Sequence, residues 1–418
     1  MSSDTYSNSE STSDSESNFE EYSLIGEILK NTYILIYELG SGTFATVWLA
    51  YNISNKKFYA IKIHDYGEDE TAYEEISFFT KLKNESCPYI NKLVESFEHE
   101  NSICMVFDLM AGSLYDIMKI GRYKNGFNLN YVKKIVSQLL TAMNILNTKH
   151  KLVHTDLKTE NILITGTNMK TKDIISLFQS DKKIISILNC YQKNKKNKVK
   201  NDKEIKKLVK NMNFDDIKNK YKKNEKNKNN EKKNEKKNEK NNEKKELVEP
   251  IKYEDIHIKL SDFGNCRDIS NPSFHIQTRY YRSPEVILEY ELNENCDMWS
   301  VGCLIYELLT GNPLFDPDKK NHLSIDQDHI LCMISTLGKI PDNLLNKSKN
   351  RNIFFKSNGL MKNVYSVPIT PLKDILEKNI NLSKTELELL HDFMIKLLEY
   401  DPFKRLSPKD ALNHKFMN

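Results

Sequence analysis

The 418-residue sequence has no run of apolar residues long enough to span a membrane, and its acidic, serine-rich start is not that of a signal peptide. It also has no Cys-x-x-Cys pair, and its seven cysteines are scattered and odd in number. These absences argue against a membrane-spanning protein, a disulfide framework and a structural zinc site. We therefore expect reduced thiols and a cytosolic or nuclear location.

Arginine is absent from residues 191–245, although this stretch carries 22 lysines and 9 acidic residues and so a net charge of +13. Residues 1–22 carry six acidic residues and no basic ones, so with a total of +4 the rest of the chain sums to −3. The basic charge therefore belongs to one segment and not to the surface of the folded parts. A compositional bias is the favoured interpretation of this segment. Nucleic-acid binding is less favoured, because arginine is missing and aromatic residues are few.

Short runs of β-branched and aromatic residues, separated by turns, begin at Thr32. They predict strands over residues 33–37, 47–51, 58–63 and 103–109, a set typical of a β-rich lobe. Between the last two, residues 69–83 change to a helical period, with Ala72, Ile76, Phe79 and Leu82 on one stripe. We therefore expect one helix to pack on this sheet.

Helical spacing dominates after Gly112. A long helix is predicted over residues 132–146, and a helix apolar nearly all round over 298–309, with Gly311 suited to its C-cap. Farther on, Ser383 and Glu386 form a capping-box pattern that opens a helix running towards Tyr400.

Strands followed by helices predict an α+β fold with two lobes. We expect a disordered tail at residues 1–22, a β-rich lobe at 23–110 and a helical lobe at 111–418, interrupted by a low-complexity insert at 166–255. The centre of the insert repeats Asn-Glu-Lys-Lys and is too polar for a core, so it is predicted to be disordered. Its first part is different, because two clusters of Ile, Leu and Phe between 174 and 188 could form amphipathic helices. Deleting about Lys193 to Lys245 should therefore leave activity and stability unchanged.

Two polar clusters carry the chemistry: the run His154-Thr155-Asp156-Leu157-Lys158-Thr159-Glu160-Asn161, and Ser261-Asp262-Phe263-Gly264 farther along. Phosphoryl transfer needs a carboxylate near the attacking hydroxyl, a cation on the γ-phosphate and oxygen ligands for Mg²⁺. Asp156 could accept or orient the hydroxyl proton, and Lys158 could neutralise the phosphoryl charge. Asn161 and Asp262 could hold Mg²⁺. Both clusters in this order predict transfer of the γ-phosphate of ATP.

A glycine-rich turn between two predicted strands is the candidate phosphate cradle, because glycine lets the backbone approach phosphates closely. Val47, which follows the turn, would pack on adenine, whereas Ala45 stands in place of the third glycine of the usual pattern. The candidate nucleotide-binding residues are Leu39, Gly40, Ser41, Gly42, Thr43, Phe44, Ala45, Val47, Ala60, Lys62, Glu75, Asp108 and Leu109.

Lys62 lies in an apolar strand, where an ammonium group without partners is costly. Glu75 lies on the inward face of the predicted helix, three residues from Ala72 and four from Phe79, and is the expected partner. Its neighbour Glu74 is the alternative.

The segment after Asp262 ends at Ser283-Pro284-Glu285, 24 residues later when both ends are counted. Glu285 is predicted to form a buried ion pair with Arg405, while Asp297 and Trp299 belong to the central helix. Thr155 stands between His154 and Asp156, where many phosphotransferases of this pattern have an arginine that collects a loop phosphate. Activity should therefore not require phosphorylation of this segment.

These motifs resemble those of the SR-protein kinases, in the wider group that includes the CDC-like and dual-specificity Tyr-regulated kinases. The resemblance runs from about Gly26 to Met417 outside the insert, whose position matches the family's spacer. Its specific carriers are His154-Thr155-Asp156, Asp262-Phe263-Gly264-Asn265, Ile276-Gln277-Thr278-Arg279-Tyr280-Tyr281-Arg282-Ser283 and Asp326-Gln327-Asp328-His329-Ile330. The resemblance implies ATP and Mg²⁺ as cofactors and serine phosphorylation in Arg/Ser-rich protein substrates. We also expect the protein to be a monomer.

The chain departs from that family at several positions. Thr159 replaces a usual proline, and Pro284 stands where SR-protein kinases often have leucine. Asn312 and Ser335 occupy places where carboxylates of the acidic docking groove are expected, whereas Asp328 matches one. A thinner groove predicts distributive phosphorylation, weakened further by Asp328→Ala.

Two other functions stay open at this stage. A CDC-like kinase would keep the chemistry and change the substrate. A pseudokinase scaffold would bind without turnover, and the presence of every chemical position counts against it.

Overall fold

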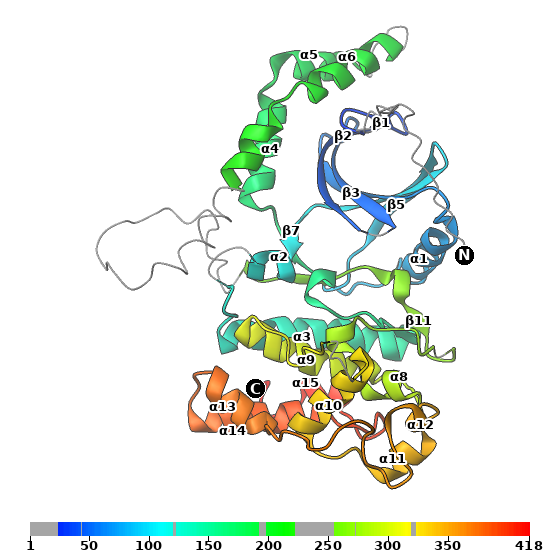
Figure 1. Ribbon diagram of the computed structural model, residues 1–418. Helices are drawn as coiled ribbons and strands as arrows, with labels where there is room; N and C mark the ends of the chain where they lie inside the picture. The colour runs from blue at the N-terminus through cyan, green and yellow to red at the C-terminus, as the bar shows by residue number, and fades with distance from the viewer. Residues whose placement is uncertain are drawn as a thin grey trace, which may run out of the picture.

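The computed structural model of the chain describes residues 24–42, 44–119, 123–191, 198–221, 255–271, 273–318 and 323–418. A curved sheet forms the upper part and a group of helices the lower part (Figure 1), which confirms the predicted two-lobed α+β fold. Within these ranges, every helix is too short or too polar to traverse a bilayer. The central repeat of the insert and the acidic tail lie outside the described residues.

The upper sheet has six strands in the order β1-β2-β3-β4-β6-β5, each antiparallel to its neighbours. Four of these strands (β2, β3, β4 and β6) were predicted from the sequence. Residues Phe58 to Ile63 of β4 alternate between partly exposed and buried, because successive side chains point to opposite faces, whereas β2, β3 and β6 contain runs of consecutive buried residues. The strands are β1 Ile28–Leu29, β2 Tyr33–Ser41, β3 Ala45–Asn52, β4 Phe58–His64, β5 Leu93–His99 and β6 Ser102–Asp108.

Helix α1 (Asp69–Lys81) packs beside this sheet (Figure 1). Its buried residues are Ala72, Glu75 and Phe79, spaced by three and four residues, so they form one inward stripe. The predicted helix over 69–83 is therefore confirmed, with two residues fewer at its end.

The lower lobe is built around α9, in which fourteen of the fifteen residues are buried. Gly311 ends this helix with φ 74°, and a Cβ there would lie 2.0 Å from the carbonyl oxygen of Lys124. Only glycine fits that close approach. The helices are α2 Leu114–Lys119, α3 Leu129–Ile145, α8 Pro284–Leu288, α9 Cys296–Thr310, α10 Ile325–Leu337, α11 Asp342–Lys347, α12 Arg351–Phe354, α13 Leu372–Asn379, α14 Lys384–Leu397 and α15 Pro408–Leu412.

The predicted capping box opens α14: the Ser383 hydroxyl accepts from the Glu386 N–H, and the Glu386 carboxylate accepts from the Ser383 N–H. The helix ends at Leu397, three residues before Tyr400. The predicted N-terminus and the course towards Tyr400 are thus confirmed.

Short strands frame the loop that carries Asp156. Strands β7 (Met110–Ser113), β9 (Ile162–Thr165) and β10 (Ile258–Leu260) form one small sheet, and β8 (Leu152–Val153) pairs with β11 (Arg267–Asp268). The insert connects β9 to β10, which are antiparallel neighbours, and the Thr165 N–H donates to the His257 carbonyl at 2.9 Å. Both ends of the insert therefore meet at one point, so a long excursion does not separate the two strands.

The first part of the insert folds against the sheet. Helices α4 (Met169–Ser180), α5 (Lys182–Tyr191) and α6 (Lys198–Lys210) arch along one side of it (Figure 1). Their apolar residues share a buried cluster with strands β2 and β3, comprising Ile34, Ile36, Leu49, Tyr51, Ile53, Ile174, Phe178, Ile184, Leu188, Tyr191, Ile205, Val209 and Phe214. The two predicted amphipathic helices are confirmed.

The deletion boundary inferred from composition is wrong. Residues 198–221 are helical except for the turn at 211–213, and the side chains of Ile205 and Val209 are fully buried against the sheet cluster. A deletion that begins at Lys193 removes them. Lysine-rich composition concealed this helix, because only two or three apolar residues per helix are needed for one buried stripe.

Two deletions with different boundaries should therefore behave differently. Replacing residues 222–254 with a Gly/Ser linker should leave the midpoint of thermal unfolding and kcat nearly unchanged, since loop closure depends weakly on length. Replacing residues 198–254 should lower the free energy of unfolding by at least ~3 kcal/mol, because Ile205, Val209 and Phe214 no longer cover the sheet. Thermal and chemical unfolding of both variants measure the difference. Equal stability of the two would mean that α6 contributes no packing energy.

Candidate active site

One face of the upper sheet carries the predicted nucleotide-binding residues. The register places Gly40 of β2 opposite Val47 of β3, and Val47 opposite Lys62 of β4. By alternation, Ala60 shares the face of Lys62. The Gly42 N–H donates to the Ala45 carbonyl at 2.9 Å and closes the glycine-rich turn. Val47 and Lys62 thus share one face of the sheet, next to the described residues of this turn.

The other nucleotide candidates surround this row. Leu39 and Ser41 are exposed in β2, and the side chain of Phe44 is 55% exposed at the turn. Asp108 ends β6 and Leu109 follows it, at the connection to the lower lobe. Thr43 lies outside the described residues.

Lys62 donates to two carboxylates on different elements. Its Nζ lies 2.7 Å from Glu75 Oε2 on α1 and 3.4 Å from Asp262 Oδ1. Burial alone would lower the pKa of Lys62, but the two carboxylates outweigh it and raise the pKa, so the ammonium stays charged. Glu75 was the predicted partner and is confirmed, whereas Glu74 lies 3.9 Å from Arg267 instead.

Asp156 lies at the centre of the loop below. Its Oδ2 accepts from Lys158 at 2.7 Å, and its Oδ1 accepts from the Thr278 hydroxyl at 2.6 Å. Burial raises the pKa of Asp156, yet the hydrogen bonds from Lys158 and Thr278 outweigh it and lower the pKa. The carboxylate is therefore ionised at neutral pH and able to accept a proton or a hydrogen bond.

A buried carboxylate holds this loop from beneath. Asp297 of α9 accepts from the backbone N–H groups of His154 at 2.8 Å and Thr155 at 2.9 Å. Thr155 has φ 66°, a strained backbone conformation that needs such support. Burial raises the pKa of Asp297 to about 6. Its predicted architectural role thus consists of two hydrogen bonds that fix the backbone before Asp156.

Asp262 is turned towards Lys62 by the residue that follows it. Phe263 is fully buried, with its ring centroid 5.2 Å from that of Phe79 and 5.4 Å from that of His154. Asp262 itself has φ 62°, and its carboxylate lies 3.4 Å from Lys62 Nζ with 38% of the side chain exposed. Packing of Phe263 on α1 therefore presents the Asp262 carboxylate to the space below the sheet.

Asn161 and Asp262 supply oxygen atoms suited to a hard cation. The Asn161 amide nitrogen donates to the Asp156 carbonyl at 2.9 Å, which leaves its side-chain oxygen as the ligand atom. The described residues contain no group of three or more His, Cys, Asp and Glu side chains that would form a protein-only metal site. A Mg²⁺ ion here would therefore need oxygens from a second ligand, as Mg²⁺ bound to substrate phosphates does.

Gln277 ties down the end of the segment that follows Asp262. It has φ 65°, and its side-chain oxygen accepts from the Ser283 N–H at 2.9 Å. Its amide nitrogen donates to the Cys296 carbonyl at 3.0 Å and to the Ser300 hydroxyl at 3.1 Å. The neutral side chain of Gln277, together with the Arg282 guanidinium that donates to the Gln277 carbonyl, therefore fixes this part of the segment.

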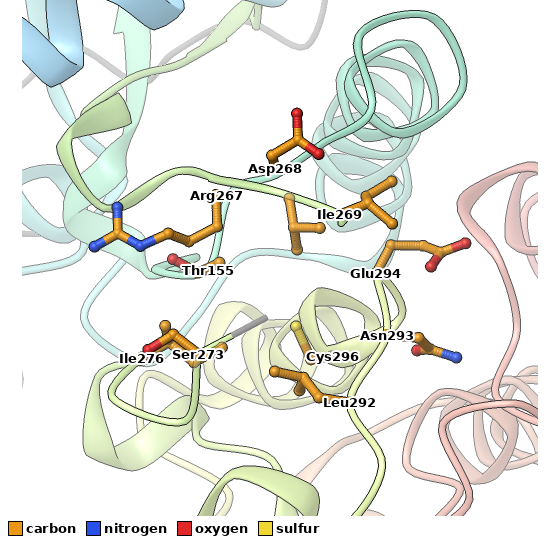
Figure 2. A pocket seen from close by; sticks show the side chains of 11 residues that line it. Thr155, Arg267, Asp268, Ile269, Ser273, Ile276, Leu292, Asn293, Glu294 and Cys296 are labelled. Carbon is orange, nitrogen blue, oxygen red and sulfur yellow. The ribbon is translucent and has the colours of Figure 1, made fainter. Parts of the chain in front are cut away.

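Thr155 borders a small cavity of about 20 Å³ beneath the same segment (Figure 2). The Thr155 hydroxyl donates to the Asn265 carbonyl at 2.5 Å. Figure 2 shows the guanidinium of Arg267 extending away from Leu292 and Cys296 on the other side of the cavity. No cluster of cations lines this space among the described residues, so a phosphate would find one guanidinium at most.

Two contacts of the site were not expected from the sequence. Thr278 bonds Asp156 from 122 positions away, and His64 of β4 lies 3.7 Å from Glu75. His64 is two residues after Lys62, so alternation along the strand could have placed it on the same face. No sequence spacing could have revealed Thr278.

Asp328 is not a surface carboxylate, and its prediction as a docking residue is wrong. Its side chain is buried, and its Oδ2 accepts from the Asp318 N–H at 3.0 Å. Asp326 is the more exposed of the two at 41% of its side chain, and it accepts from Arg279 at 2.5 Å. Helix α10 points Asp326 outward and Asp328 inward because residues two apart lie on different faces.

The protein kinase domain family matches residues 33–183 and 251–417. Serine/threonine-protein kinase SRPK of Physarum polycephalum is 30% identical, over 94% of this chain and 87% of its own. Protein kinase dsk1 of Schizosaccharomyces pombe is 29% identical, over 89% and 78%. Dual specificity protein kinase CLK1 of Homo sapiens is 29% identical, over 94% and 67%.

Proposed function

Because the chain belongs to the protein kinase family, and within it to the group of the SR-protein kinases, we propose that it transfers the γ-phosphate of Mg-ATP to serines of basic, Arg/Ser-rich proteins. It is a serine/threonine protein kinase. The observation that carries the proposal is the convergence of Asp156, Lys158 and Thr278 below Lys62 and Asp262.

Asp156, Lys158 and Thr278 have different roles in the phosphoryl transfer. Asp156 accepts a hydrogen bond from the attacking serine hydroxyl and orients it, because its carboxylate is ionised. Lys158 donates to Asp156 at 2.7 Å and to the Thr278 hydroxyl at 3.2 Å, so its ammonium lies where the transferred group gains charge. Thr278 holds Asp156 in one orientation.

The nucleotide site fits ATP and Mg²⁺. Lys62 carries a charged ammonium with 21% of its side chain exposed, and it would contact the phosphates beneath the glycine-rich turn. Val47 and Ala60 would bind the adenine ring, while Asn161 and Asp262 would hold the metal through their oxygens. When bound, Mg²⁺ supplies charge neutralisation between phosphate oxygens. Chelation of Mg²⁺ with excess EDTA should abolish turnover.

The test of the function is incubation with Mg-ATP and a peptide of alternating arginine and serine. Serine-linked phosphate, identified by mass spectrometry, supports the proposal. Thermal stabilisation by Mg-ATP without any turnover would support the scaffold alternative. Preference for a peptide poor in arginine would support the CDC-like alternative. All seven cysteines are free thiols, which fits action in the cytosol or nucleus.

Exposed carboxylates near α10 support the choice of a basic substrate. Asp316 and Asp318 are exposed in the loop that the buried Asp328 fixes, and Asp326 lies on the next helix. Asn312 and Ser335 add no charge. Steering of an arginine-rich peptide therefore depends on few charges and weakens as salt rises.

Removing two of these charges should affect basic substrates only. Asp316→Asn with Asp318→Asn should lower kcat/KM for an arginine-rich peptide roughly two- to tenfold at low salt, the scale of two exposed ion pairs. Asp374→Asn, an exposed carboxylate on α13, is the matched control and should have no effect. Multi-serine substrates should pass through partly phosphorylated forms. Fully modified chains beside untouched ones early in the reaction would contradict this weakly charged groove.

Activity should survive removal of phosphate from the segment between Asp262 and Ser283. Gln277 and Thr155 hold the segment and the loop by neutral hydrogen bonds, so no phosphate is needed to order them. Enzyme expressed and treated with phosphatase should keep kcat within about twofold. Gln277→Ala, by contrast, should lower kcat even in untreated enzyme. Inactivation by phosphatase, with recovery only on rephosphorylation, would refute this prediction.

A further inference from the structure

His64 is a buried histidine whose role the proposed function leaves open. It is the last residue of β4, it is 3% exposed, and it pairs across the sheet with Ala45. Because it follows Lys62 by two residues, its side chain lies on the same face of the sheet and points towards α1. Its Nε2 lies 3.7 Å from Glu75 Oε2, the same oxygen that Lys62 contacts at 2.7 Å.

Neither ring nitrogen of His64 has a hydrogen-bond partner among the described residues. A buried polar group without a partner destabilises a protein, and apolar residues fill such a place at lower cost. Valine or leucine would suit the β4 position as well. The imidazole therefore needs a function that offsets its burial.

The surroundings keep His64 neutral and direct its one N–H group. Burial and the neighbouring Lys62 ammonium lower the pKa of His64 to about 4, against a smaller opposing effect of Asp262. A neutral imidazole has one donor and one acceptor nitrogen. The carboxylate of Glu75 accepts a hydrogen bond and cannot donate one, so the donor nitrogen is the one that faces it.

We propose that His64 is a positioning residue that donates a hydrogen bond to Glu75 when the nucleotide draws Lys62 towards its phosphates. The proposal rests on the roles given above to Lys62 and Glu75. A shift of about 0.8 Å would bring Nε2 to the usual distance of about 2.9 Å from Oε2. The buried carboxylate of Glu75 then accepts a hydrogen bond from His64 while Lys62 also contacts the phosphates. Because Glu75 belongs to α1, this hydrogen bond holds α1 beside the sheet.

Glu75 also accepts a hydrogen bond from the Phe263 backbone, so His64 is a further donor, and the need for it follows from the burial of Glu75. Its side chain is 2% exposed, and burial raises the pKa of Glu75, which shows how much the charged form depends on its partners. Lys62 also lies 3.4 Å from Asp262, so its ammonium is already divided between two carboxylates. When the nucleotide is bound, its phosphate oxygens also accept hydrogen bonds from the three N–H groups of the Lys62 ammonium.

His64→Leu tests the inference, with His64→Gln as the matched variant that keeps a donor of similar reach. Leucine should lower kcat/KM for ATP roughly tenfold, the factor expected for a lost hydrogen bond to a charged group. It should also reduce the thermal stabilisation given by Mg-ATP. Glutamine should restore both to within about threefold.

Stability without nucleotide separates positioning from simple packing. Because the imidazole has no partner in that state, His64→Leu should leave the free enzyme as stable as the wild type or more stable. Loss of stability in both variants together with activity would mean that His64 only fills space, and the inference would be wrong. Wild-type kcat/KM and Mg-ATP stabilisation in His64→Leu would also overturn it. A wild-type enzyme without turnover would instead refute the proposed function.

Discussion

Replacing Asp156 by alanine is expected to lower kcat by at least ~10²-fold, the scale of a lost electrostatic contribution to the transition state. The carboxylate is the acceptor that orients the attacking hydroxyl, and Lys158 and Thr278 both bond to it. Asp156→Asn should lose nearly as much, because an amide keeps the shape and gives up the charge. Steady-state phosphorylation of an Arg/Ser peptide measures both losses. The kcat of Lys62→Met should fall by a similar factor.

The matched control is Glu160→Ala, an exposed carboxylate on the same loop. It should keep wild-type kcat, and all these variants should keep the wild-type circular dichroism spectrum and a cooperative unfolding transition. Near-wild-type turnover in a folded Asp156→Ala protein would show that another group orients the hydroxyl. If Asp156→Ala does not fold, the kcat of Asp156→Asn tests the role of the carboxylate instead.

Replacing Arg405 by leucine is expected to lower the free energy of unfolding by about 3–5 kcal/mol, the cost of leaving a buried charge without its partner. Arg405 donates to Glu285 through two nitrogens at 2.6 and 2.9 Å, and neither side chain is exposed. The predicted ion pair is thus confirmed. The ion pair joins the end of the segment after Asp262 to the chain just before α15. Its loss therefore also weakens the attachment of that segment to the lower lobe. Chemical denaturation measures the change.

Lys404 provides the control for that variant. It is 70% exposed and lies 3.6 Å from Asp401, so Lys404→Leu should change the free energy of unfolding by less than about 1 kcal/mol. Replacing Glu285 and Arg405 together by leucine and methionine should cost less than the sum of the single changes, because no buried charge is then left alone. Strict additivity of the two single losses would contradict a direct pair.

Much of the site could be predicted because its chemistry depends on local spacing. Asp156, Lys158 and Asn161 follow one another within six residues, and Lys62 and Glu75 lie on a strand and a helix with clear periodicity. The same periodicity gave α1, α3 and α9. Glu75 could be chosen over Glu74 because one position along a helix turns a side chain by about 100°.

The failed predictions concern residues whose environment comes from distant segments. Asp328 matched a docking carboxylate in sequence, yet α10 turns it inward to bond the Asp318 N–H. The lysine-rich composition of α6 predicted a solvated part of the insert. Two of its side chains, Ile205 and Val209, are nevertheless fully buried against strands more than 140 residues earlier in the chain. Sequence composition records what a segment contains and not what it packs against.

Local spacing along the chain is enough to predict the reaction class, the two-lobed fold and the identity of the charged groups, because each depends on neighbours within a few turns of helix or strand. Which of those groups meet depends on how the elements pack. Thr278 reaches Asp156 across 122 positions, and His64, on the same strand as Lys62, lies 3.7 Å from Glu75 on α1. The physical reason is that hydrogen bonds and buried charges depend on distances of a few ångströms. Those distances are set when the sheet, α1 and α9 pack together, after local structure has been chosen.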